Sequence, residues 1–154
     1  MATTDFNKLT GSVINLLNTS SVVPKPYTGY TGSLFFRANQ ELSFRNDSPK
    51  GRVIADESFM ENKSFGNGFG YDKVYNIFID FYTIPGIKDT TGVQDYELVN
   101  RYLELIESAI VNNTGSLGPV TIVNIADQDA PIRIDELGNN VIGGRKLIVF
   151  RERR

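Results

Sequence analysis

Residues 73–84 read KVYNIFIDFYTI, and this stretch decides the fold. Apolar side chains recur at every second position, which is the period of a β-strand. One face is entirely apolar and consists of Tyr75, Ile77, Ile79 and Phe81. The other face mixes apolar and polar side chains, namely Val74, Asn76, Phe78, Asp80 and Tyr82. We therefore predict a central strand that helices cover on its apolar face and that makes contacts on its mixed face.

Two amphipathic helices are predicted, one before and one after this strand. Residues 95–112, DYELVNRYLELIESAIVN, carry apolar side chains three and four positions apart, which is the spacing of one helix face. That stripe consists of Leu98, Val99, Tyr102, Leu105, Ile106, Ala109 and Ile110. Residues 3–17 show a shorter stripe of the same kind, and Thr3 or Thr4 is predicted to cap that helix.

Short apolar segments elsewhere predict further strands. They are SLFFR at 33–37, ELSFR at 41–45, PVTIVNI at 119–125, PIRID at 131–135 and VIGGRKLIVF at 141–150. The first two are expected to pair with each other, and Gly143-Gly144 suggests a bulge in the last. Residues 46–72 are rich in Gly, Ser, Asn and Asp and are predicted to form a long loop.

These elements predict one α+β domain over residues 1–154. Its expected architecture is a mostly antiparallel or mixed β-sheet with an N-terminal helix and one long amphipathic helix packed on it.

The composition excludes several kinds of site. The 154 residues include no Cys and no His, which excludes disulfides, thiolate nucleophiles and His-containing triads, and removes the commonest metal ligand. A net charge of −2 gives no global basic surface for nucleic acid. The N-terminus lacks the pattern of a secretory signal, and no apolar run approaches the roughly 20 residues of a membrane span. Enzymes that use carboxylates, Lys or Tyr remain compatible with this composition, but it favours a protein that binds or assembles, made in the cytoplasm.

The stretch SFGNGFGYD at 64–72 raises the question of a phosphate-binding loop. Such a loop follows a strand and opens a helix, whereas these glycines precede a strand. Two interpretations remain: a plain flexible loop, or an assembly loop whose aromatic side chains contact another subunit. The aromatic side chains that we consider for a subunit or partner interface are Phe59, Phe65, Phe69 and Tyr71.

An acidic cluster follows the second helix. It consists of Asp127, Asp129, Asp135 and Glu136. We interpret this cluster as a solvated loop between strands, with a carboxylate-dependent metal-binding or catalytic site as the alternative.

The chain ends on the basic sequence FRERR. If residues 145–151 form a strand, Arg145 and Arg151 share one face and become further candidates for an interface. The basic end is expected either to keep a sheet edge soluble, or to contact an acidic neighbouring subunit or nucleic acid.

The order of these elements resembles that of the tail terminator (tail-completion) proteins of long-tailed bacteriophages. The segments YNIFIDFYT, DYELVNRYLELIESAI and GGRKLIVF carry the resemblance, which covers most of the chain and is best over residues 73–154. It implies an α+β subunit of a homohexameric ring at the head-proximal end of the virion tail. That ring caps the tube of tail tube protein, stops its polymerisation and joins it to a head-completion or neck protein.

The same resemblance implies no catalytic residue, no cofactor and no membrane contact. It also implies that DNA can pass through the ring without sequence recognition. The alternatives are another ring-forming connector, such as a head-closure or tail-tube subunit, a metal-binding domain, or a monomeric adaptor.

Overall fold

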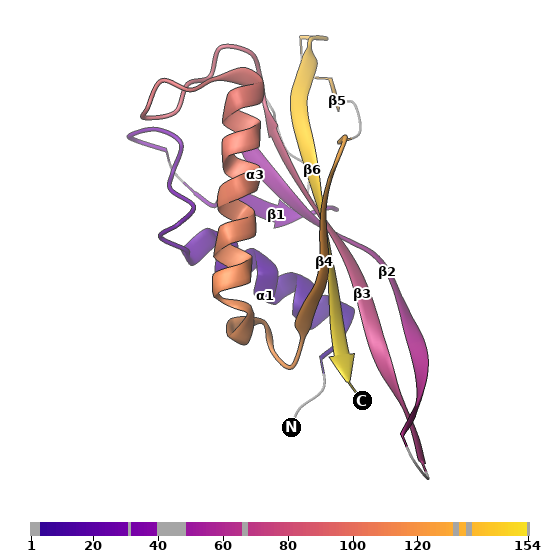
Figure 1. Ribbon diagram of the computed structural model, residues 1–154. Helices are drawn as coiled ribbons and strands as arrows, with labels where there is room; N and C mark the ends of the chain where they lie inside the picture. The colour runs from indigo at the N-terminus through magenta and orange to yellow at the C-terminus, as the bar shows by residue number, and fades with distance from the viewer. Residues whose placement is uncertain are drawn as a thin grey trace.

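A computed structural model describes residues 4–30, 32–39, 49–65, 68–130, 133–134 and 137–153, and for residues 57, 59–65 and 68–70 it describes the backbone alone. Within these residues the chain forms two α-helices and a six-stranded mixed sheet in one compact domain, as expected for an α+β protein (Figure 1). The helices are α1 (Phe6–Thr19) and α3 (Asp95–Asn112), followed by a short 3-10 helix, η1 (Thr114–Leu117). The strands are β1 (Phe35–Arg37), β2 (Lys50–Phe65), β3 (Gly68–Thr83), β4 (Thr121–Gln128), β5 (Arg133–Ile134) and β6 (Asn140–Arg153).

Strand β3 is central, as its sequence pattern predicted. The strand order is β1-β2-β3-β6-β4, and β5 pairs with the start of β6. Strands β2, β3, β6 and β4 are each antiparallel to the next, whereas β1 is parallel to β2. It follows that β2 and β4, which lie toward opposite edges of the sheet, run in opposite directions.

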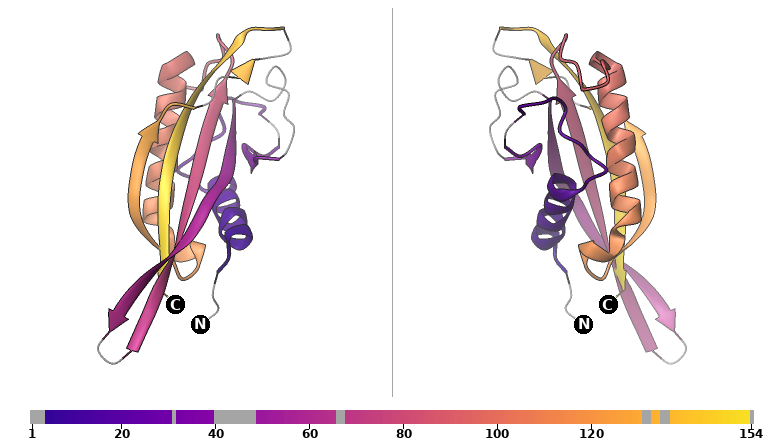
Figure 2. Two further views of the ribbon diagram at one scale, coloured as in Figure 1. Left: turned by 90° about the vertical axis from the view of Figure 1, so that its right-hand side faces the viewer. Right: turned by 90° about the vertical axis from the view of Figure 1, so that its left-hand side faces the viewer.

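Both helices cover the same face of the sheet. Figure 2 looks at the sheet from two opposite sides, and α1 and α3 lie in front of it in one view and behind it in the other. Helix α1 begins after Asp5, whose carboxylate accepts a hydrogen bond from the backbone N–H of Lys8 at 2.8 Å. Asp5, one residue after the predicted Thr4, is therefore the residue that caps this helix, and the other candidate, Thr3, lies outside the described residues.

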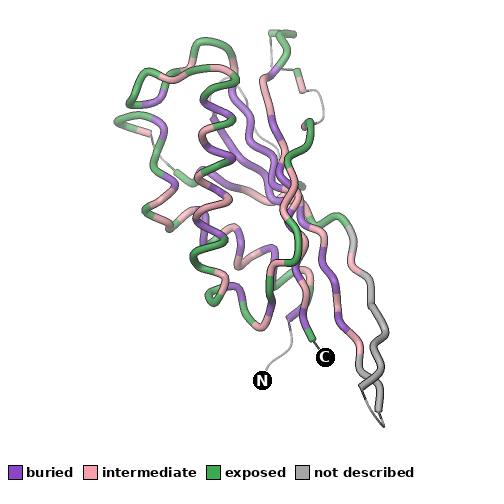
Figure 3. The backbone as a smooth tube through the Cα atoms, viewed as in Figure 1, coloured by how far each residue is buried: buried purple, intermediate pink, exposed green. Residues whose placement is uncertain are grey.

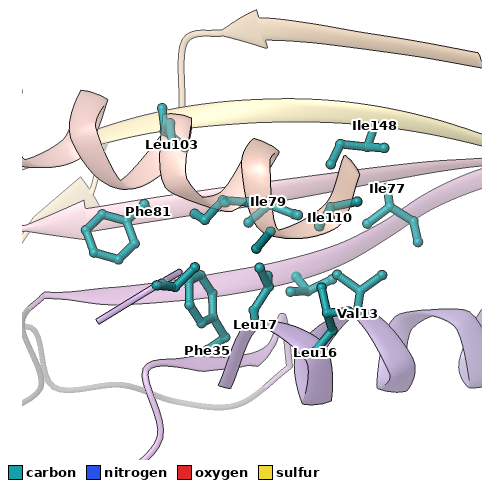
Figure 4. Close-up of a cluster of buried hydrophobic side chains, with 14 of the residues drawn as sticks. Val13, Leu16, Leu17, Phe35, Ile77, Ile79, Phe81, Leu103, Ile110 and Ile148 are labelled. Carbon is teal, nitrogen blue, oxygen red and sulfur yellow. The ribbon is translucent and has the colours of Figure 1, made fainter. Parts of the chain in front are cut away.

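The core lies between the two helices and the apolar face of β3 (Figure 4). Tyr75, Ile77, Ile79 and Phe81 are all fully buried there, which confirms that this face is the inner one. The Phe81 ring stacks on the Tyr102 ring of α3, with the ring centroids 4.6 Å apart. Buried positions recur along the inner sides of the helices and strands in Figure 3.

The prediction of a long loop at 46–72 was wrong. Most of that segment belongs to β2 and β3, which pair continuously from Lys50↔Tyr82 to Phe65↔Gly68, with one bulge between Ala55 and Glu57. Strand β6 reaches β3 only as far as Asp72, so residues 62–65 and 68–71 pair with each other alone. We call these residues the hairpin arm; Figure 1 shows it projecting past the ends of the other strands.

Three smaller expectations also need correction. The segment 33–37 contributes β1, which pairs in parallel with β2, while its expected partner at 41–45 lies outside the described residues. Gly143 and Gly144 sit in a regular ladder opposite Tyr82 and Phe81, without a bulge. Leu105 is only partly buried, and Leu103 takes its place in the core because α3 turns that side toward β6.

Candidate assembly surface

The face of the sheet opposite the helices carries Arg145 and Arg151, the two charged residues proposed from the sequence as interface candidates. Side chains alternate along each strand, so the cross-strand register fixes which of them share this face. We call it the helix-free face; it includes Arg52, Ile54, Asp72, Asn76, Phe78, Asp80, Tyr82, Ala126, Arg145, Leu147, Val149, Arg151 and Arg153.

A buried ion pair occupies one end of the helix-free face. Asp80 is fully buried, and its two carboxylate oxygens accept hydrogen bonds from Arg145 Nε at 2.6 Å and from a terminal nitrogen of Arg145 at 2.8 Å. The Tyr82 hydroxyl donates a third hydrogen bond to Asp80, at 2.9 Å. The bond to Asp80 raises the pKa of Arg145, and burial raises the pKa of Tyr82. This bidentate geometry is the strong form of an arginine–carboxylate pair.

A second carboxylate lies at the other end of the helix-free face. Asp72 is almost fully buried, with Arg151 Nε at 3.4 Å and Arg153 Nε at 3.8 Å from its oxygens. Arginines from β6 therefore meet a buried aspartate of β3 at both ends of this face.

Apolar side chains lie between the two charged ends. Ile54, Phe78, Leu147 and Val149 are each only partly buried, whereas the inner face of the same strands is almost completely buried. The Arg145 guanidinium lies over the Phe78 ring, 4.3 Å from its centroid. Partly exposed apolar side chains with charged residues at both ends are typical of a contact surface.

The sheet also has two unlike edges. Within the described ranges no strand pairs with the outer side of β4, and β1 pairs with β2 only over residues 51–53. Strand β4 reads TIVNIADQ, without the Lys or Pro that commonly protects an edge, and it has a single bulge between Ile122 and Asn124. Its Val123 is 42% exposed. Because β2 and β4 run in opposite directions, a second copy that continued the sheet would pair its β2 with this β4 in antiparallel fashion.

A groove of about 530 Å³ lies beside β4, between that strand, the first half of β6 and α3. Glu104, Asp127 and Asp129 give it an acidic lining. Lys146 lies at its base with its side chain almost fully buried, and its Nζ is 2.9 Å from Asp127 and 3.8 Å from Glu107. The β4 side of the molecule is thus acidic, while the helix-free face is rich in arginine.

The structure brings together some of the predicted interface residues. Arg145 and Arg151 do share one face, as predicted, and each has a buried aspartate as its partner. Tyr71 is partly buried and its side chain lies on the helix-covered face of the sheet. Side chains alternate along β3, which has no bulge, and Tyr71 is nine residues from Asp80, which lies on the helix-free face. The backbones of Phe59, Phe65 and Phe69 lie on β2 and β3, while their side chains are outside the described residues.

The two buried aspartates were not among the residues predicted from the sequence to form a site. Asp80 and Asp72 are charged residues on a strand with strongly apolar neighbours, and arginines recur on β6 at the matching cross-strand positions. That complementary spacing is the signal that could have identified them.

The acidic cluster looks different in the structure from a metal site. Asp127 pairs with Lys146, and Asp129 lies farther along the same groove; Asp135 and Glu136 are outside the described residues. Where side chains are described, no three acidic residues lie close enough together to hold a metal ion. Neither described helix has the length and apolar content needed to cross a membrane.

Comparison with the models of known protein families and with curated proteins gives no match.

Proposed function

We propose that this chain is a structural subunit of a bacteriophage virion, a tail terminator that assembles into a ring. The observation that carries the proposal is one sheet with two unlike edges, β4 and the outer side of β2 beyond Val53, that no other described strand pairs with. An interface between unlike surfaces leaves one free surface of each kind on every growing oligomer, so growth ends only in a closed ring or continues as a filament.

The order of the elements favours the ring. A central strand, a strong amphipathic helix and closing strands resemble the tail terminator proteins, whose subunits form a hexamer on the end of the tail tube. In this proposal the ring stops the growth of the tube of tail tube protein and presents its other side to a head-completion or neck protein. DNA passes through the ring without sequence recognition, and the ring resides at the head-proximal end of the tail.

The proposed contact between copies is a β-ladder. Strand β4 has eight residues, and the part of β2 beyond β1 spans residues 54–65, which is long enough to pair with all of β4. Backbone hydrogen bonds supply the affinity of such an added strand, and side chains on the two faces select the register. The hairpin arm is formed by the far ends of β2 and β3, next to the proposed contact between copies. In the proposed ring it contacts the tube or the neck protein.

Electron microscopy of the purified protein tests this function. We expect closed rings when the protein is alone, and rings at the ends of tubes assembled from the tail tube protein of the same phage. Tubes assembled in its presence should be shorter, because capped ends do not grow. Rings that form but never bind tubes would instead favour another connector, and a protein that remains monomeric with and without tubes would contradict the proposal.

A further inference from the structure

Three arginines from three different strands converge on the end of the helix-free face near Tyr82. Arg52 on β2 and Arg145 on β6 lie on either side of Asp80 in the cross-strand register. Arg133 on β5 places its guanidinium carbon 5.7 Å from the centroid of the Tyr82 ring. We call these residues, Arg52, Asp80, Tyr82, Arg133 and Arg145, the arginine corner.

Among the described side chains, Arg145 is the one arginine of the three that has a carboxylate partner. Asp80 gives both of its oxygens to Arg145 and accepts a further hydrogen bond from Tyr82. Arg52 donates one long hydrogen bond, from a terminal nitrogen to the backbone oxygen of Ala38 at 3.4 Å. In the described part of the chain no carboxylate forms an ion pair with Arg52 or Arg133, and the Nε atoms of both are buried without an acceptor.

The positive charge in the corner is therefore in excess. Burial and the neighbouring charge of Arg133 both lower the pKa of Arg52. The hydrogen bond to Asp80 raises the pKa of Arg145 most, and Asp56 also raises it from a distance, but Asp56 is exposed, and among the described side chains three arginines face these two aspartates. A partly buried charge without a partner destabilises a fold, and a buried polar group without one calls for a specific explanation, such as a bound ion.

We propose that the arginine corner binds an oxyanion, a phosphate or a carboxylate, between Arg52 and Arg133. A guanidinium group offers paired N–H donors that match the oxygens of either anion, and it keeps its charge at every physiological pH. Tyr82 supports the site: its ring is almost fully buried and lies across Gly143, where a Cβ would be 2.5 Å from the ring. The neutral ring fixes the position of Arg133 without neutralising it.

The oxyanion has two possible sources, a free phosphate-type ion or a carboxylate of another copy of the chain. Exposed Asp129, which follows the end of β4, is the candidate for the second source, since β4 ends at the level of Arg52 in the cross-strand register, whereas Asp127 faces the helix side and pairs with Lys146. The first source does not depend on the proposed ring, so the oxyanion site can fail or hold independently of it.

Thermal unfolding and calorimetric titration with inorganic phosphate test the site, with sodium chloride used to hold the ionic strength constant. We expect saturable stabilisation of the wild-type protein. Arg52→Gln and Arg133→Gln should each weaken phosphate binding at least tenfold. Arg37→Gln is the matched control, because Arg37 belongs to the neighbouring strand β1 and its guanidinium contacts Asn7 of α1 instead of the corner.

The melting temperature without phosphate shows whether Arg52 binds the anion or only stabilises the fold. Without phosphate, Arg52→Gln should leave the melting temperature unchanged or raise it, because the substitution removes an uncompensated charge. No saturable stabilisation by phosphate, or equal stabilisation of Arg52→Gln and Arg37→Gln, would overturn the proposal.

The mass of the protein in solution identifies the source. If a carboxylate of another copy fills the corner, phosphate should compete with it and reduce self-association, and Arg52→Gln should reduce self-association too. If a free ion fills the corner, phosphate should bind without changing the mass. Both results support an oxyanion site, and they assign it to different partners.

Discussion

Gly144 lies on β6 directly beneath α3. A Cβ on Gly144 would lie 2.7 Å from Leu103 Cδ1 and 2.9 Å from Val99 Cγ1. Both neighbours are buried in the core and have little room to move. We predict that Gly144→Ala lowers the free energy of unfolding by about 1–3 kcal/mol, the usual cost of overpacking.

Gly115→Ala is the matched control, because a Cβ at Gly115 would meet nothing within 4 Å. Chemical denaturation of the two variants measures the difference. Equal stabilities would show that α3 does not pack on β6 as described.

Tyr102 makes the stability of the protein sensitive to alkaline pH. Its hydroxyl donates a hydrogen bond to the backbone oxygen of Pro24 at 2.6 Å, and burial raises the pKa of Tyr102 from its ordinary value of 10.0 to about 12. A raised pKa in the folded state means that folding opposes ionisation. This contribution to stability is therefore fully present below about pH 10, and it is lost as the pH rises toward 12.

We predict that Tyr102→Phe is less stable than wild type at neutral pH by about 1 kcal/mol, the net value of one hydrogen bond. It should also lose less stability than wild type between about pH 9 and about pH 11, because the ionisable hydroxyl is gone. Denaturant titrations of both proteins at several pH values measure the two effects. If the unfolding free energies of wild type and Tyr102→Phe changed with pH in parallel, Tyr102 would not be the group responsible for the alkaline sensitivity.

At the scale of single residues, the sequence patterns predicted which face of the sheet a side chain lies on, but not which residue it pairs with. Alternation placed Arg145 and Arg151 on one face, as observed. It gave no indication that Asp80 is the partner of Arg145, because that contact depends on the register between two strands far apart in the sequence.

At the scale of elements, helix α3 and strand β3 were predictable because each packs one face on the core. The observed bounds of α3 are those that its apolar stripe predicted. The hairpin arm was missed because residues 62–64 are polar and residues 68–71 alternate glycine with Phe69 and Tyr71, a composition that is typical of a loop. Its strands are specified by pairing with each other, and Gly68 and Gly70 further weaken the local preference for a strand.

Helix α3 gives a direct test of which side faces the core. Ile106 is fully buried, so Ile106→Ala should cost about 2–5 kcal/mol of unfolding free energy. Leu105→Ala removes a similar volume from a partly buried position next to it and should cost clearly less. Chemical denaturation compares the two, and a larger loss for Leu105→Ala would mean that the helix is rotated about its axis.

At the scale of the whole molecule, charge is distributed unevenly in a way that the net value of −2 conceals. Arginines gather on the helix-free face, and acidic side chains line the groove beside β4. Together with two unlike edges, this distribution favours contact between different surfaces of identical copies. Composition alone could not predict it, since the distribution depends on which strands become neighbours.

The mass of the purified protein in solution tests this account most directly, when wild type is compared with two double lysine variants. Val123→Lys with Asn124→Lys changes the exposed edge strand β4, where an unpaired charge opposes the addition of another strand. Val111→Lys with Asn112→Lys makes the same change at the exposed end of α3, where Val111 is 49% exposed.

Light scattering should give wild type and the α3 variant the mass of a closed ring, about 103 kDa for six chains of 17.2 kDa. The β4 variant should have the mass of one chain while remaining folded. A monomeric wild type at every concentration, or a β4 variant that assembles as well as the α3 variant, would contradict the account.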